Sequence, residues 1–175
     1  MLLRSSFVLL ALILLLSLPA MAGSVMIGYS VTGLGGSSFQ YDYWIYNDDA
    51  GFPVQLFDIY FDPTLYLETS LTATTPPPLS TDWDQIFLHS VPPLGAAYDA
   101  LANGAGIPEG SFVSGFEVQF TWLGQGLPGP QPFEVYDPDR FSLLQSGTTQ
   151  GPEPSFFGLV GLAIAYGGWK LRRAR

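Results

Sequence analysis

The stretch from residue 23 to residue 151 is divided into short apolar runs by clusters of glycine, proline and aspartate. In the clearest run, 112–123, aromatic or aliphatic residues occupy every second position from Phe116 to Trp122. A period of two places such side chains on one face of a β-strand, and turn residues between the runs end each strand. The pattern therefore predicts a fold built mainly of short antiparallel strands.

The runs differ in what they predict. Strands are predicted for residues 24–31, 39–46, 54–61, 65–71, 85–90, 112–123, 132–136 and 140–145. A Gly/Ser turn is predicted for 32–38, and one or two helical turns for 95–103. The run 54–61 is apolar on both faces except at Gln55 and Asp58, which is typical of a central strand. The number and spacing of the runs indicate an antiparallel β-sandwich, and we expect an immunoglobulin-like topology.

Charge is distributed unevenly along the chain. Between Gly23 and Gly151 there are fourteen acidic residues and a single basic one, Arg140. Nucleic-acid phosphates are bound through lysine and arginine, so no nucleic-acid partner is expected. That stretch has no lysine, and the whole chain has no cysteine. Disulfides, thiolate metal sites, cysteine nucleophiles and Schiff-base chemistry are excluded there.

The first 22 residues have the parts of a secretory signal peptide. The first six residues form a short n-region with the basic Arg4, and residues 7–18 form the apolar h-region. Ala20 and Ala22 supply the small residues that precede a cleavage site. We predict that signal peptidase cuts after Ala22 and leaves Gly23 as the first residue. The alternative is an uncleaved anchor, although the apolar run is shorter than the roughly 20 residues of a membrane helix.

The last residues, 152–175, also fall into three parts. The tripeptide Pro152-Glu153-Pro154 precedes an uncharged apolar segment, 155–169, and a basic tail, 170–175. As a helix the segment is about 22 Å long against a hydrocarbon core of roughly 30 Å, so we predict one short transmembrane helix. The alternative is a buried C-terminal helix of a soluble domain.

The basic tail sets the expected topology. Its charged residues are Lys170, Arg172, Arg173 and Arg175. By the positive-inside rule they place the C-terminus in the cytoplasm and the acidic stretch outside. The signal peptide requires the same orientation, so the two ends of the chain agree.

This C-terminal arrangement resembles the PEP-CTERM sorting signal of exported proteins in Gram-negative bacteria. The resemblance implies that Pro152, Glu153 and Pro154 are recognised by an exosortase, a membrane cysteine protease or transpeptidase. It implies that the basic tail is a stop signal and that the helix anchors the protein transiently in the inner membrane. Such proteins then reach the cell surface or extracellular matrix, where they are associated with polysaccharide and biofilm.

Catalytic chemistry has little support in the sequence. His89 is the chain's one histidine, and a serine hydrolase would need it as the base for Ser90 or a distant serine. No G-x-S-x-G nucleophile elbow is present. We expect His89 to be a strand-end or loop residue with a satisfied hydrogen bond. We therefore predict that the protein is not an enzyme, with no catalytic residues and no cofactor.

Calcium is the one metal considered, because its ligands are carboxylates and carbonyls. The candidates are the pairs Asp48/Asp49, Asp82/Asp84 and, as the pair retained, Asp137/Asp139. None of them fits the pattern of an EF-hand. Solvated turn aspartates are the alternative interpretation.

Aromatic residues offer a second candidate function. Tyr41, Tyr43, Trp44 and Trp83 are candidates to stack on sugar rings, provided that they lie on an exposed sheet face. Core packing is the alternative for each ring. The leading prediction is a non-enzymatic surface or matrix protein with a β-sandwich domain and an exosortase sorting signal. The alternative is a carbohydrate-binding module delivered to the extracellular polysaccharide by the same route.

Overall fold

The computed structural model describes residues 24–90 and 95–151. The predicted signal peptide with its cleavage site, the motif 152–154, the predicted transmembrane helix 155–169 and the basic tail 170–175 lie outside the described residues. Within the described ranges, no helix combines the length and the apolar character needed to cross a bilayer.

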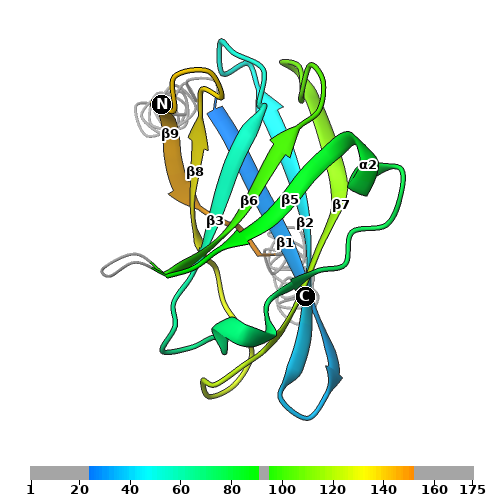
Figure 1. Cartoon of the computed structure of the whole chain (residues 1–175), viewed down its shortest axis with the longest axis vertical. Helices are drawn as coiled ribbons and strands as arrows, with labels where there is room; N and C mark the ends of the chain where they lie inside the picture. The colour runs from blue at the N-terminus through cyan, green and yellow to red at the C-terminus, as the bar shows by residue number, and fades with distance from the viewer. Residues whose placement is uncertain (1–23, 91–94, 152–175) are drawn as a thin grey trace, which may run out of the picture.

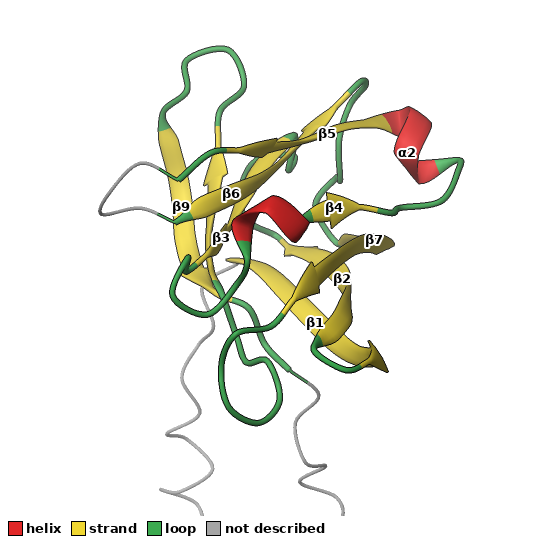
Figure 2. Ribbon diagram, turned by 60° about the horizontal axis from the view of Figure 1, so that its bottom comes forward, coloured by secondary structure: helices red, strands yellow, loops and turns green. Residues whose placement is uncertain are grey.

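The described chain forms two antiparallel β-sheets packed face to face (Figures 1 and 2). The elements are β1 (Ser24–Gly35), β2 (Ser38–Asp48), β3 (Leu56–Phe61), η1 (Glu68–Ser70), β4 (Thr72–Ala73), α2 (Leu79–Asp82), β5 (Trp83–Leu88), β6 (Ala96–Ala102), β7 (Ser111–Thr121), β8 (Pro132–Tyr136) and β9 (Leu143–Thr148). One sheet has the order β1-β2-β7-β4, and the other has the order β5-β6-β3-β8-β9. The predicted mainly-β sandwich is confirmed, and β3 is the central strand that its two apolar faces predicted.

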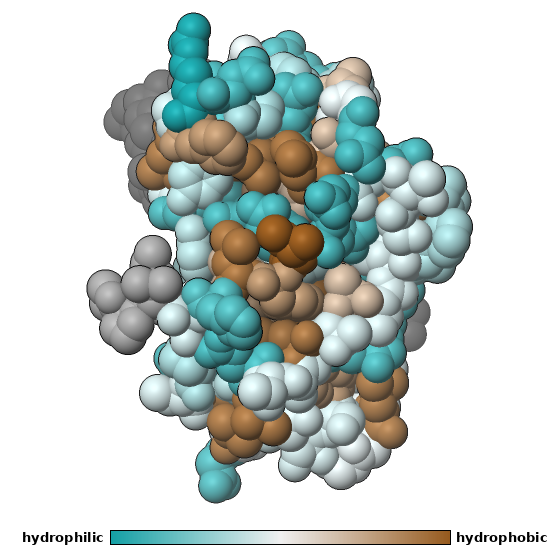
Figure 3. Space-filling model, viewed as in Figure 1, coloured by the Kyte–Doolittle hydropathy of each residue, from teal (hydrophilic) through white to brown (hydrophobic). Residues whose placement is uncertain are grey.

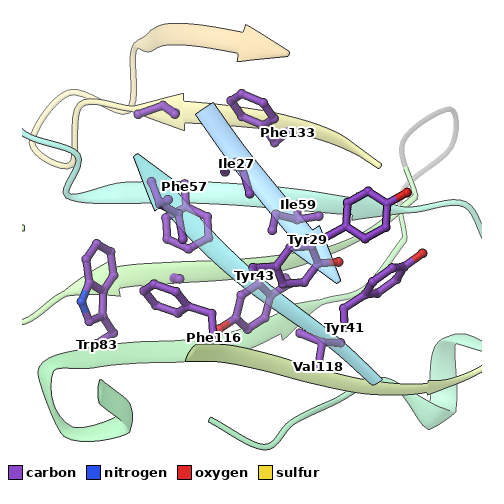
Figure 4. Packing of buried hydrophobic residues seen from close by; sticks show 14 of the residues in the cluster. Ile27, Tyr29, Tyr41, Tyr43, Phe57, Ile59, Trp83, Phe116, Val118 and Phe133 are labelled. Carbon is purple, nitrogen blue, oxygen red and sulfur yellow. The ribbon is translucent and has the colours of Figure 1, made fainter. Parts of the chain in front are cut away.

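Aromatic rings fill the space between the sheets (Figure 4). Tyr41 and Tyr43 of β2 are buried, as are Phe116 of β7 and Phe57 of β3. The rings of Phe57 and Phe116 meet edge to face across the sheets, with centroids 5.2 Å apart. The period of two in β2 and β7 correctly groups these rings on one face of each strand, and the structure turns that face into the core.

A buried polar network joins the two sheets. Gln131, just before β8, is 1% exposed. Its Nε2 donates to the Tyr66 hydroxyl at 3.0 Å, and its Oε1 accepts from the Tyr43 hydroxyl at 3.0 Å and from Thr149 Oγ1 at 3.2 Å. The hydroxyl of Tyr41 lies 2.8 Å from that of Tyr66. The side chains of Gln131, Tyr41, Tyr43, Tyr66 and Thr149 thus satisfy one another in the core.

The helical turns predicted for 95–103 are wrong, because this segment is strand β6. Its alanines and leucine favour a helix locally, but β6 forms ladders with both β5 and β3. Alternation also places Tyr98 and Ala100 in the core, with Asp99 and Leu101 on the outer face. Two backbone ladders and this burial outweigh a weak helix propensity.

Other predicted boundaries also need correction. The predicted turn 32–38 is mostly strand, because β1 continues to Gly35 and the hairpin reverses at Gly36. The predicted strand 65–71 is instead a turn and the 3₁₀ helix η1, since Asp62 Oδ1 accepts from the Thr64 N–H at 2.8 Å and begins the turn. Strand 140–145 is shifted to Leu143–Thr148.

Candidate functional site

The outer face of the five-stranded sheet carries a row of acids across three neighbouring strands. Asp58 of β3 lies opposite Asp99 of β6 on one side and opposite Glu134 of β8 on the other. Side chains directly opposite in antiparallel strands stand close together, and like charges there repel. Figure 3 shows this face of the molecule, where apolar patches are interrupted by hydrophilic side chains.

Asp58 is the most buried member of the row. It is 8% exposed, and its Oδ1 is buried without a hydrogen-bond partner among the described residues. Burial, then the neighbouring carboxylate of Asp99, raises the pKa of Asp58 to about 7. Burial also raises the pKa of Asp99. The row therefore keeps a proton up to near neutral pH, which reduces the repulsion between its carboxylates.

Two tyrosines orient Glu134. Tyr60 of β3 donates its hydroxyl to Glu134 Oε2 at 2.6 Å, and the hydroxyl of Tyr136 donates to the same oxygen. The two hydroxyls lie 3.3 Å apart. Among the described residues, no donor reaches Glu134 Oε1. One carboxylate oxygen is thus fixed, and the other is free to accept a hydrogen bond.

A groove of about 700 Å³ opens beside this row, at one end of β3, β8 and β9. Its polar lining consists of Tyr60, Asp62, Thr64, Glu134, Ser146 and Thr148. Pro63 and Pro132 supply apolar surface, whereas Phe133 is only 3% exposed. Among the described residues, neither lysine nor arginine lines the groove. The Phe133 ring lies against Gly147, where a Cβ atom would come within 2.7 Å of the ring. The volume and the mixed lining are those of a small-ligand site.

The predicted sugar-stacking residues divide between core and surface. Tyr41, Tyr43 and Trp83 are at most 5% exposed, so their rings pack in the core and are not available to a sugar. That part of the prediction is wrong, because the alternation of β2 turns the two tyrosines inward. Trp44 points to the outer face of the four-stranded sheet and is 36% exposed.

Trp44 lies across Gly28 of β1, where any Cβ atom would overlap the indole. Tyr46 of β2 and the exposed Phe112 of β7 lie opposite each other in the neighbouring row. Trp44, Tyr46 and Phe112 therefore form a small aromatic platform on the second outer face.

His89 and Ser90 follow the end of β5 and both contact Glu68. His89 Nδ1 lies 2.9 Å from Glu68 Oε1, and Ser90 Oγ donates to Glu68 Oε2 at 2.6 Å. The hydrogen bonds from Ser90 and His89 lower the pKa of Glu68 to about 2. Ser90 thus bonds to the carboxylate rather than to the imidazole, which is not the Ser–His–Asp relay.

The calcium candidates do not form a cluster. Asp137 Oδ1 accepts from the N–H groups of Asp139 and Arg140, at 2.9 Å and 3.2 Å, and so shapes the β8–β9 turn. In the part of the chain that the structure describes, no three histidine, aspartate or glutamate side chains converge as a metal site.

Sequence reasoning did not single out the groove or the acidic row. Two residues could have pointed to the acidic row. Asp58 is a charged residue inside an otherwise apolar run, and Glu134 lies between Phe133 and Val135, which are apolar. Neither signal reveals that the two carboxylates face each other. That relationship depends on the register between β3 and β8, which are more than 70 residues apart in the chain.

The fold and the site together define an acidic antiparallel β-sandwich with an open groove on one outer sheet face. No family model matches the chain, and no curated protein matches it.

Among solved structures, similarity is found to a GH20 exo-β-N-acetylglucosaminidase from Vibrio harveyi in complex with N-acetylglucosamine (TM-score 0.40, 8% identity, 73% of this chain). The match spans 18% of that enzyme's length. Similarity is also found to CaCohA2 from Clostridium acetobutylicum, with a TM-score of 0.35 and 16% identity. That match covers 74% of this chain and 93% of CaCohA2. Likenesses at this level assign neither a family nor a function.

Proposed function

We propose that this chain is an exported cell-surface or extracellular-matrix protein of a Gram-negative bacterium, with a non-enzymatic β-sandwich domain. Signal peptidase and an exosortase process its two ends, and the C-terminal helix anchors it transiently in the inner membrane. The observation that carries the proposal is the ordered C-terminal sequence of motif, apolar segment and basic tail, together with a signal peptide of matching topology. The sandwich occupies the stretch between them.

Intact-mass analysis of the native protein tests the processing. We expect a first residue at Gly23 and a last residue close to Pro152, Glu153 and Pro154. A control strain that lacks the exosortase should keep the chain through Arg175. A mature protein that ends in Arg175 in a strain with a working exosortase would contradict the sorting proposal.

We further propose that the sandwich is of the immunoglobulin type. Support comes from the order β1-β2-β7-β4, which corresponds to A-B-E-D, and from the neighbours β3-β8-β9, which correspond to C-F-G. The hairpin β5–β6 would then be an addition that widens the second sheet beside β3.

A second candidate function is carbohydrate binding by the same exported protein. The observation that favours it is the open groove, whose lining combines four hydroxyl side chains, two carboxylates and apolar surface. Sugars present hydroxyl groups to such acceptors and apolar ring faces to such surfaces. An oligosaccharide-binding screen with the full-length chain tests this candidate, with Tyr60→Ala as the groove variant and Trp44→Ala as the platform variant.

A further inference from the structure

The groove has a one-sided charge. Asp62 and Glu134 line it, and Asp58 and Asp99 extend the acidic row from Glu134 across the same sheet face. Arg140, the single basic residue of the described ranges, lies in the β8–β9 turn and does not line the groove. An anionic ligand such as a uronate therefore meets repulsion, whereas a cationic group is attracted.

The carboxylate of Glu134 is oriented by two hydrogen bonds and keeps one oxygen free to accept another. Tyr60 and Tyr136 occupy its Oε2, and its Oε1 has no donor among the described residues. Fixing the carboxylate in advance reduces the side-chain entropy that the protein loses when a ligand binds. A charged donor forms the strongest hydrogen bond with such an oxygen.

Asp58 lies next to Glu134 in the acidic row but outside the groove lining. It is 8% exposed, and burial, then the neighbouring Asp99, raises its pKa to about 7. Below neutral pH it therefore keeps its proton. The attraction for a positive charge then comes from the two carboxylates that line the groove, those of Glu134 and Asp62.

We propose that the groove binds saccharides that carry a free ammonium group, as a de-N-acetylated hexosamine does. The ammonium group pairs with Glu134 Oε1, and the sugar hydroxyls bond to Ser146 and Thr148 on β9. This inference rests on the second candidate function and adds the class of sugar. The groove's size favours a saccharide over a flat protein contact.

The test compares three hexasaccharides by calorimetry with the full-length chain: glucosamine, N-acetylglucosamine and galacturonate oligomers. Below neutral pH, where the amine is protonated, we expect the glucosamine oligomer to bind about ten-fold more tightly than its N-acetylated form. The galacturonate oligomer should bind most weakly. The preference should shrink as salt is added, because screening weakens charge pairing.

Two matched variants locate the effect. Glu134→Gln should remove the preference, so that the glucosamine oligomer binds no more tightly than the N-acetylated form. Glu117→Gln, a carboxylate on the other sheet, should leave both unchanged. Equal binding of all three oligomers would overturn the proposal and leave glycan binding intact, whereas no binding at all would overturn both. Oligolysine binding as tightly as the amino sugar would also overturn it, since charge alone would then suffice.

Discussion

The side-chain amide of Gln145 exchanges two hydrogen bonds with the backbone of Val25. Its Oε1 accepts from the Val25 N–H at 2.8 Å, and its Nε2 donates to the Val25 carbonyl at 2.7 Å. Farther along β1, Gln150 exchanges two backbone hydrogen bonds with the strand, at 2.9 Å with Tyr29 and 2.8 Å with Ile27. Gln145 of β9 and Gln150 after it therefore cover the outer edge of β1 from Val25 to Tyr29, which blocks pairing of that part with another chain.

Replacing Gln145 by alanine should lower the free energy of unfolding by about 1–3 kcal/mol, because it leaves the Val25 peptide without its partners. Urea denaturation monitored by tryptophan fluorescence measures the change. Gln125→Ala, in an exposed loop, is the control and should have little effect. Equal stability of the two variants would show that the Val25 contact does not stabilise the edge.

Replacing Gln131 by leucine should destabilise the fold by about 2 kcal/mol or more, since the buried hydroxyls of Tyr43 and Tyr66 lose a partner. Tyr43→Phe removes one hydroxyl of the same network and should cost about 1 kcal/mol. The double variant, combined with both single variants in a denaturation cycle, measures the coupling. Strict additivity would argue against a cooperative network.

Replacing Gly28 by alanine should displace the indole of Trp44, which lies where the new Cβ atom would be. We expect a loss of about 1–3 kcal/mol, typical of overpacking, and a shifted tryptophan emission. Gly104→Ala is the control, because open space surrounds that position. Unchanged emission of Gly28→Ala would mean that Trp44 does not rest on this glycine.

Stability should fall as the pH rises from about 4 to about 7. The pKa of Asp58 is raised to about 7 by burial and by Asp99, so over this range the folded state keeps a proton that the unfolded state loses. Asp58→Asn should flatten the fall, and the exposed Asp139→Asn should not. Thermal denaturation across this range measures the slope, and an unchanged slope in Asp58→Asn would contradict the assignment.

Glu68 should act in the opposite direction and at lower pH. The hydrogen bonds from Ser90 and His89 lower its pKa to about 2, so its contribution to stability is present above about 4.5 and is lost as the pH falls toward 2. Glu68→Gln should weaken this acid-induced loss. Ser90→Ala should reproduce part of the effect, and a slope identical to the parent in both variants would contradict it.

Local pattern predicted much of the sandwich because one face of each strand is buried. The alternation in β7 correctly put Phe116, Val118 and Phe120 on one face, which the structure buries, and the apolar run of β3 correctly indicated a central strand. The same pattern was wrong for β6, where alanine-rich residues favour a helix locally. It left Tyr41 and Tyr43 open between sugar stacking and core packing, since periodicity shows which residues share a face and not which face is buried.

The sequence by itself determined the mainly-β class, the acidic character of residues 23–151 and the order of motif, apolar segment and basic tail at the C-terminal end, because periodicity, charge and residue order are local properties. Only the tertiary structure decided that Asp58 meets Asp99 and Glu134, that Tyr60 and Tyr136 orient one carboxylate, and that a groove opens beside them. Those relationships arise from the register between strands distant in the chain, which core packing and backbone ladders set together.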